Sequence, residues 1–256
     1  MKTVMLVAVL VALVSPLVPR EASAQTTRVN VRVVSHDAKI IGDGVGGARV
    51  VVRDPSTGRV LAEGIQRGGT GDTESIVREP HARGQAVYEA PGAAVFTAEF
   101  ELDAPKVLEF IGEGPLGYEH AMQRAVKRML VVPGEDILGD GVVLELHGFI
   151  VELIEPETPA AGETVTVTAR VRLLCGCPHT PGGLWDAVRI SVKARLYEGT
   201  RVIREAILEY AGEPNMFTGA ISLQDAGPNS TLVVLASDAD RANFGMSLGT
   251  RVGSRP

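Results

Sequence analysis

The chain contains little cysteine, few aromatic residues and no excess of positive charge. Two of its 256 residues are cysteine, one is tryptophan, and aromatic residues make up 4%. So few cysteines exclude a small domain held together by several disulfides. A formal net charge of -6 leaves no basic surplus to neutralise phosphates, so we do not expect nucleic acid as a partner. The 45% hydrophobic content is enough for the cores of one or two domains.

A long apolar run occurs only in the first segment of the chain. Lys2 precedes the run Val4–Val14, and the small residues Ala22-Ser23-Ala24 follow it. This order is typical of a secretory signal peptide, which we assign to residues 1–24. We therefore expect an exported protein, periplasmic or extracellular. A membrane anchor is the alternative, but the run is too short to cross a bilayer, and no membrane span is expected in the mature chain.

Apolar and polar residues alternate along much of the remaining chain. Alternation of this kind places one face of a β-strand on a core and the other face in water. Turns rich in glycine and proline separate the alternating runs. The pattern is clearest in residues 28–33, 95–102, 164–173 and 188–196. We therefore predict an all-β fold of two tandem antiparallel β-sandwich modules.

One segment of the first half follows a helical spacing instead. Ala121, Ala125 and Met129 recur every four residues between Gly117 and Pro133. This spacing predicts one short amphipathic helix in the first module. Basic residues surround the apolar positions, and we interpret them as a solvated face.

The boundary between the two modules falls near a proline-containing stretch at residues 155–159. We assign residues 25–148 to the first module, residues 149–251 to the second and residues 252–256 to a tail. Alternatively, residues 149–154 form a continuous strand that bridges both modules. In that case the modules would have little freedom to move relative to each other.

Residues 46–64 contain a strand, a turn with Thr57-Gly58, a second strand and a glycine-marked loop. This segment resembles the opening of transthyretin-like and carboxypeptidase-regulatory-like domains. The resemblance implies a seven-stranded sandwich that serves as an accessory or binding module, with no catalytic residue. The second module resembles an immunoglobulin-like sandwich. It departs from that fold in the strand Thr231–Ala236, which lacks the cysteine expected there.

Both cysteines and the one tryptophan lie in the segment Cys175–Trp185, which we call the Cys loop. Three interpretations of the loop stay open. Cys175 and Cys177 can form a local disulfide, which needs a turn at Gly176 to bring them close enough. Alternatively, the two thiolates and His179 can bind a soft metal, with Cu or Zn as the candidate cofactor. The third interpretation is an intermolecular disulfide or two free thiols.

Trp185 ends the Cys loop and either covers the candidate site or fills the mouth of the core. The remaining histidines are His36, His81, His120 and His147, and their spacing fits no metalloprotease motif. We expect His36, His81 and His147 at the surface. A Gly-x-Ser-x-Gly spacing occurs at Gly245-Met246-Ser247-Leu248-Gly249, but no strand-to-helix pattern surrounds it as this hydrolase motif requires, so hydrolase chemistry has no specific support.

Two functional hypotheses follow. The first is an exported, non-enzymatic binding or accessory protein of the cell envelope, with an envelope protein or a small ligand as partner. The second is a periplasmic soft-metal-binding or thiol-redox protein that uses Cys175, Cys177 and His179. Thiol titration combined with metal analysis separates them, because only the second needs reactive thiols or a bound ion.

Overall fold

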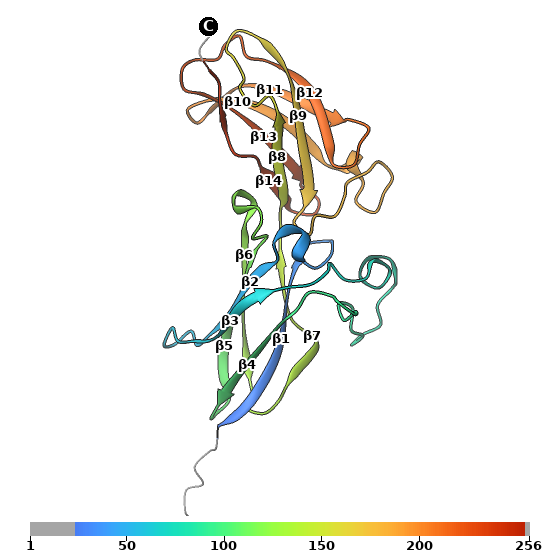
Figure 1. Cartoon of the computed structure of the whole chain (residues 1–256), viewed down its shortest axis with the longest axis vertical. Coiled ribbons are helices and arrows are strands. Elements are labelled where there is room, and N and C mark those ends of the chain that lie inside the picture. The colour runs from blue at the N-terminus through green and yellow to red at the C-terminus, as the bar shows by residue number, and fades with distance from the viewer. Residues whose placement is uncertain (1–23, 254–256) are drawn as a thin grey trace, which may run out of the picture.

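The computed structural model describes residues 24–253, so the predicted signal peptide lies outside the described residues, Ala24 excepted. β-Strands dominate this part of the chain, which confirms the all-β prediction (Figure 1). The first seven strands are β1 (Gln25–Ser35), β2 (Ala48–Arg53), β3 (Val60–Gln66), β4 (Phe96–Leu102), β5 (Lys106–Gly114), β6 (Gln123–Val131) and β7 (Ile137–Leu146). The others are β8 (Phe149–Glu155), β9 (Thr164–Leu173), β10 (Ser191–Glu198), β11 (Arg201–Tyr210), β12 (Met216–Ser222), β13 (Ser230–Asp238), β14 (Asn243–Met246) and β15 (Thr250–Arg251). None of the helices in residues 24–253 is long and apolar enough to span a membrane.

The first module consists of two sheets, with strand orders β4-β1-β7 and β3-β2-β5-β6. Alternate apolar residues of both sheets meet in one core, which includes Val31, Val50, Leu108, Phe110 and Leu144. Gly112 of β5 lets the sheets approach closely, because a Cβ atom there would lie 2.8 Å from a methyl group of Val33. Seven strands in two sheets agree with the architecture that the resemblance implied, but this count does not establish the family.

One strand pair of the first module departs from the antiparallel arrangement. β1 runs parallel to β7, with Val34 opposite Glu145 and Ser35 opposite Leu146. Alternation reveals which face of a strand is buried but not the direction of its partner. Because the pair is parallel, both strands end at the same edge of the sheet, next to the second module (Figure 1).

A buried glutamine fixes the end of β1 to the opposite sheet. Gln66, the last residue of β3, is fully buried. Its side-chain oxygen accepts a hydrogen bond from the Val33 amide at 2.7 Å, and its side-chain nitrogen donates to the carbonyl oxygens of Val33 and Ile41. The amide therefore satisfies backbone groups that would otherwise be buried without partners.

The long segment between β3 and β4 covers part of the outer face of β1 and β7. It contains the short π-helix η2 (Glu74–Arg78), so a short helical element does occur in the first module. Asp140 of β7 accepts hydrogen bonds of 2.7 Å from the amides of Val87 and Tyr88, which ties the segment to the sheet. A small separate core beneath it contains Val34, Ile40, Ile76 and Ala94.

The helix predicted between Gly117 and Pro133 is wrong, because residues 123–131 form the strand β6. β6 pairs with β5 in antiparallel register along its whole length. A spacing of four residues fits one face of a helix, but it also fits one face of a strand. Ala125 and Met129 accordingly both pack on the core from an extended backbone.

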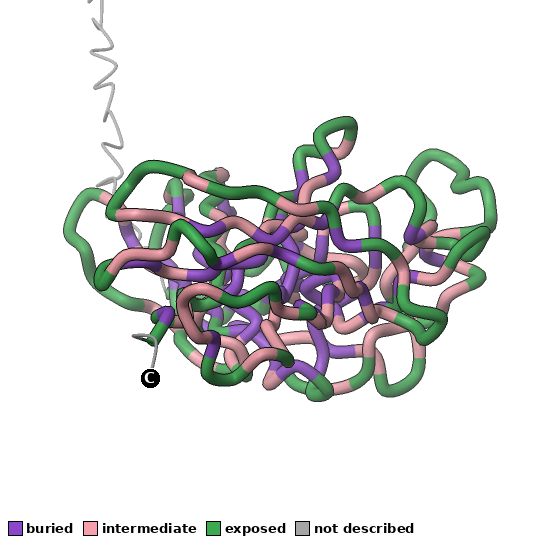
Figure 2. Tube along the Cα trace, turned by 90° about the horizontal axis from the view of Figure 1, so that it is seen from above, coloured by how far each residue is buried: buried purple, intermediate pink, exposed green. Residues whose placement is uncertain are grey.

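The second module is one hydrogen-bonded sheet that folds over on itself. Its order is β14-β13-β10-β11-β12-β9-β8, with β15 beside β13. β11 and β12 are joined by only two residue pairs, where the sheet turns from one layer to the other. Val171 of β9, Ala194 of β10 and Val234 of β13 meet in the core between the layers. Buried residues run through the interior, and exposed residues gather at the outer loops (Figure 2).

The two modules meet at a tight junction. Only His147 and Gly148 separate β7 from β8. Gly148 has a φ of +147°, and a Cβ atom there would lie 3.3 Å from the carbonyl oxygen of Phe244, so a larger residue would strain the connection. The cores also interlock, because Ile150 of β8 packs in the first core and Ala38 of the first module packs in the second.

Candidate functional site

Cys175 and Cys177 lie just after β9, and their sulfur atoms are bonded to each other. Gly176 between them has a φ of +79°, a left-handed conformation that brings the two Cα atoms to 5.4 Å. Both side chains belong to the core of the second module and are 4% and 6% exposed. A metal-binding or thiol-exchange role would require that this bond be reduced and that the sulfurs become accessible.

His179 is also packed in the core of the second module. It is 2% exposed, and its ring lies edge-on to that of Phe149, with 5.5 Å between ring centres. Its Nδ1 lies 3.3 Å from the carbonyl oxygen of Val171, and its backbone amide donates to the side-chain oxygen of Asn215 at 2.7 Å. Burial lowers the pKa of His179 below its ordinary value, which favours the neutral ring.

Trp185 connects the Cys loop to the first module. Its half-buried ring packs against the second core, and its Nε1 donates a hydrogen bond of 2.9 Å to the carbonyl oxygen of Asp37. Asp37 lies in the turn after β1 with a φ of +51°, a conformation that aspartate tolerates. Trp185 thus links the Cys loop to the turn that follows β1 in the first module.

A pocket of about 190 Å³ lies beside Trp185 at this junction. Phe149 and Leu173 provide apolar walls, and three aspartates and two arginines also line it. The volume is below the ~300 Å³ typical of sites for drug-sized ligands. The pocket is therefore of a size that suits one protein side chain or a small molecular group.

The three aspartates of the pocket and Arg241 already have hydrogen-bond or ion-pair partners. Arg241 binds the carboxylate of Asp37 across the junction and that of Asp238 at 3.1 Å. The hydrogen bond to Asp238 is the main reason that the pKa of Arg241 is raised. Asp186 accepts hydrogen bonds from the amides of Val188 and Gly182, which hold its pKa below the usual range. Each of these three carboxylates therefore already has an ion-pair or hydrogen-bond partner.

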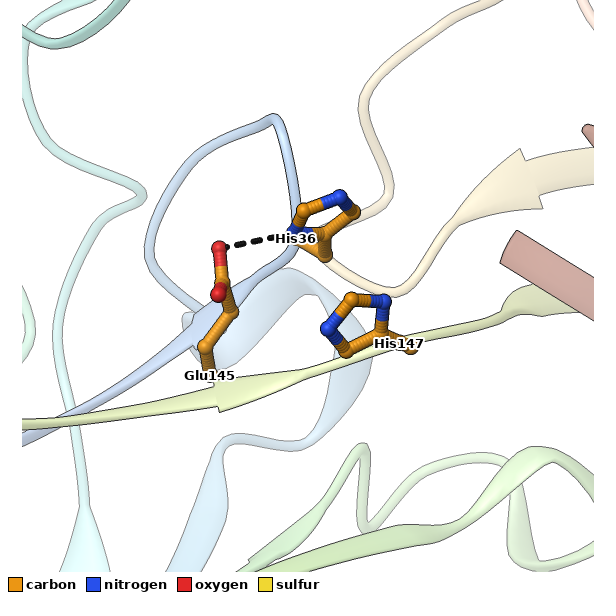
Figure 3. A group of neighbouring side chains, drawn as sticks. All are labelled: His36, Glu145 and His147. Atoms are coloured by element: carbon orange, nitrogen blue, oxygen red, sulfur yellow. Dashed lines mark hydrogen bonds and ion pairs between the residues drawn. The ribbon is translucent and has the colours of Figure 1, made fainter. Parts of the chain in front are cut away.

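A second group of polar residues lies at the end of the β1–β7 pair. We call His36, Glu145 and His147 the histidine cluster (Figure 3). Nδ1 of His36 lies 2.9 Å from a carboxylate oxygen of Glu145, and the two imidazole rings are stacked with their centres 3.9 Å apart. Within residues 24–253, this is the one set of three histidine, cysteine or carboxylate side chains whose ligand atoms lie within 4.8 Å of one another.

The histidine cluster was missed by the sequence analysis, which predicted His36 and His147 as unrelated surface residues. Each histidine directly follows a strand that ends in alternating residues, and the two strands pair in parallel. Recognising β1 and β7 as parallel partners would have placed the two histidines side by side. The Cys loop, in contrast, keeps Cys175, Cys177 and His179 together in the second module, but it does not bring them together as three metal ligands.

Each of the two other histidines contacts a backbone carbonyl oxygen. His120 contacts the carbonyl oxygen of Val151 through its Nε2 at 3.0 Å and so joins the first module to β8. His81 contacts the carbonyl oxygen of Ser75 in the segment between β3 and β4. Neither belongs to the histidine cluster.

Comparison with known proteins gives a distant likeness only. No known protein family and no curated protein matches the sequence. The chain is similar to a solved structure of three immunoglobulin domains of titin that carries an E-to-A mutation, with 13% identity and a TM-score of 0.24. The similarity covers 91% of this chain and 65% of the titin chain, so this chain spans slightly less than two thirds of that structure. At this distance the likeness assigns the chain to no family.

Proposed function

We propose that the protein is an exported, non-enzymatic binding or accessory component of the cell envelope, periplasmic or extracellular. In this proposal residues 25–148 and 149–251 are the two modules, the first transthyretin-like and the second immunoglobulin-like. The partner is an envelope protein or a small ligand. It inserts one side chain or one small group into the pocket at the junction.

The observation that carries this proposal is the state of the polar groups in the pocket. A general acid or base works best with a pKa near the working pH and with a free position toward its substrate. Asp37 and Asp238 are bound by Arg241, and Asp186 is bound by backbone amides. A pocket whose carboxylates are already bound, and whose walls include Phe149 and Trp185, suits recognition better than proton transfer.

Two features of the chain support an exported location. The segment 1–24 has the features of an export signal, and the bonded pair Cys175–Cys177 fits an oxidising environment. The alternative role of the Cys loop in soft-metal binding or thiol exchange has less support, because both sulfurs are buried and bonded to each other.

Site-specific photo-crosslinking in cells tests the proposal. A photoreactive amino acid at Leu184, an exposed residue lining the pocket, should give one discrete crosslinked product with an envelope protein. The same amino acid at Ile207, which is exposed on β11 away from the pocket, is the matched control. The same cells should contain a chain that begins at Gln25, as mass spectrometry can show. A cytoplasmic chain, or equal products from both positions, would refute the proposal.

A further inference from the structure

The backbone explains why three metal-type ligands meet at the end of β1 and β7. In a parallel pair, residues in register lie beside each other on the same face. Ser35 is opposite Leu146, so the next residues, His36 and His147, are neighbours, and the His36 amide donates to the Leu146 carbonyl at 2.8 Å. Glu145 lies two residues before His147 and therefore shares its face.

The ligand atoms are close to the separation that one ion requires. Zn²⁺ binds imidazole nitrogen and carboxylate oxygen at about 2.0–2.2 Å, which places neighbouring ligand atoms about 3.3 Å apart. Nδ1 of His36 and the oxygen of Glu145 are 2.9 Å apart, and all three ligand atoms lie within 4.8 Å. Glu145 and His147 are exposed and His36 is partly so, which leaves the side chains room to turn toward a common centre. Both rings present a nitrogen on the side of the Glu145 carboxylate (Figure 3).

The electrostatic surroundings favour a cation. The carboxylate of Glu145 pairs with His36, and Arg241, the arginine next to this turn, is occupied by Asp37 and Asp238. Lys39, the nearest lysine in sequence, is directed to the hydroxyl of Thr73.

We propose that His36, Glu145 and His147 bind one divalent transition-metal ion, with Zn²⁺ as the best-suited ion. Two imidazoles and one carboxylate give three protein ligands, so a water molecule or a group from a partner fills the fourth position. The ion would connect the ends of β1 and β7 and stabilise the first module at the junction. This site is separate from the junction pocket, and it does not depend on the function proposed above.

Calorimetric titration of the metal-free, untagged protein with zinc chloride tests the proposal. We expect one ion per chain with a Kd of about 1 µM. Replacing His147 by alanine, or Glu145 by glutamine, should weaken binding at least about 100-fold, because loss of a direct ligand exceeds the 10- to 100-fold effect of an outer partner. His81→Ala removes a histidine of the same module outside the cluster and should leave the Kd unchanged.

Two further measurements keep the test decisive. Co²⁺ in place of Zn²⁺ should give the intense visible absorption of a four-coordinate site in the parent protein and in His81→Ala, but not in His147→Ala. The metal-free variants should unfold at the same temperature as the parent, since the substituted side chains are exposed. Binding that is as strong in His147→Ala and Glu145→Gln as in the parent, or a Kd weaker than about 1 mM in the parent, would overturn the proposal.

Discussion

The Cys loop and the histidine cluster lie on either side of the same junction, and they use histidine in opposite ways. His179 is buried, held by Val171 and packed on Phe149. His147 is exposed and stacks on His36 beside a carboxylate. Burial lowers the pKa of the first ring and so favours its neutral form, whereas the second ring remains accessible to ions and partners.

The difference shows that residues adjacent in sequence need not be the ones that form a functional site. The residues of the Cys loop are adjacent in sequence, and a disulfide and core packing satisfy them. His36 and Glu145 are 109 residues apart, and the parallel pairing of two strands brings them together at the surface. The cysteines that are grouped in sequence here stabilise the structure, while two histidines and a glutamate from distant strands form the candidate ion site.

The largest expected difference between the two regions concerns stability. His179→Ala should lower the free energy of unfolding by about 3 kcal/mol, because it leaves a cavity in the core and removes the contact with the Val171 carbonyl oxygen. His147→Ala should change it by less than about 0.5 kcal/mol without metal, as is usual for surface residues. Urea unfolding of both variants measures the contrast. Equal losses would show that the two histidines do not differ in structural role.

Removal of the disulfide should have the next largest effect. The double variant Cys175→Ala, Cys177→Ala should lose about 2 kcal/mol, less than the ~3 kcal/mol of a 15-residue loop, because the loop closed here is very short. Denaturant unfolding with and without reductant measures the loss. A thiol reagent should label the parent only after reduction and unfolding. Rapid labelling of the folded, unreduced parent would contradict a buried, bonded pair.

The pH dependence of stability should reveal the burial of His179 in the second module. Since the pKa of His179 is lowered in the folded state, the unfolded chain takes up a proton below pH ~6.5 that the folded chain does not. Stability should therefore fall as the pH decreases from about 6.5, by at most ~1.4 kcal/mol per pH unit. His179→Gln should reduce the loss between pH 7.5 and 5.5 by about 1 kcal/mol. An unchanged slope would show that His179 protonates as readily in the folded state.

The smallest effect concerns the ion pairs that span the junction. Arg241→Ala removes the bridge between the exposed carboxylate of Asp37 and the buried one of Asp238. Because the Arg241 side chain is itself partly exposed, stability should fall by no more than about 1 kcal/mol. Quenching of Trp185 fluorescence by acrylamide should nevertheless increase. The turn at Asp37, which accepts the hydrogen bond from Trp185, loses its ion pair with Arg241. Arg195→Ala, which breaks an ion pair between β10 and Glu205 of β11, should leave the quenching unchanged.

Much of the fold could be predicted from local alternation. Residues 95–102 and 164–173 correspond to β4 and β9, and the turn at Thr57-Gly58 separates β2 from β3 as expected. The error at residues 121–129 arose because a spacing of four is shared by both kinds of element. Only the pairing with β5, which depends on distant residues, distinguishes them.

The candidate sites could be predicted only in part. The sequence placed Cys175 and Cys177 in a turn at Gly176, which the structure contains. It did not reveal the pocket, because Asp37 and Arg241 meet there from opposite modules. It also did not reveal the histidine cluster, because strand direction is a property of the whole sheet. Both sites depend on long-range packing.

The two-residue connection between β7 and β8 also affects how the molecule spans space. β1 begins at one end of the elongated molecule, and β11 and β12 lie at the other (Figure 1). Because only His147 and Gly148 connect the two halves and their cores share residues, we expect the halves to keep one relative orientation. An attachment at the β1 end would therefore hold the loops near β11 and β12 at a fixed distance from the attachment point.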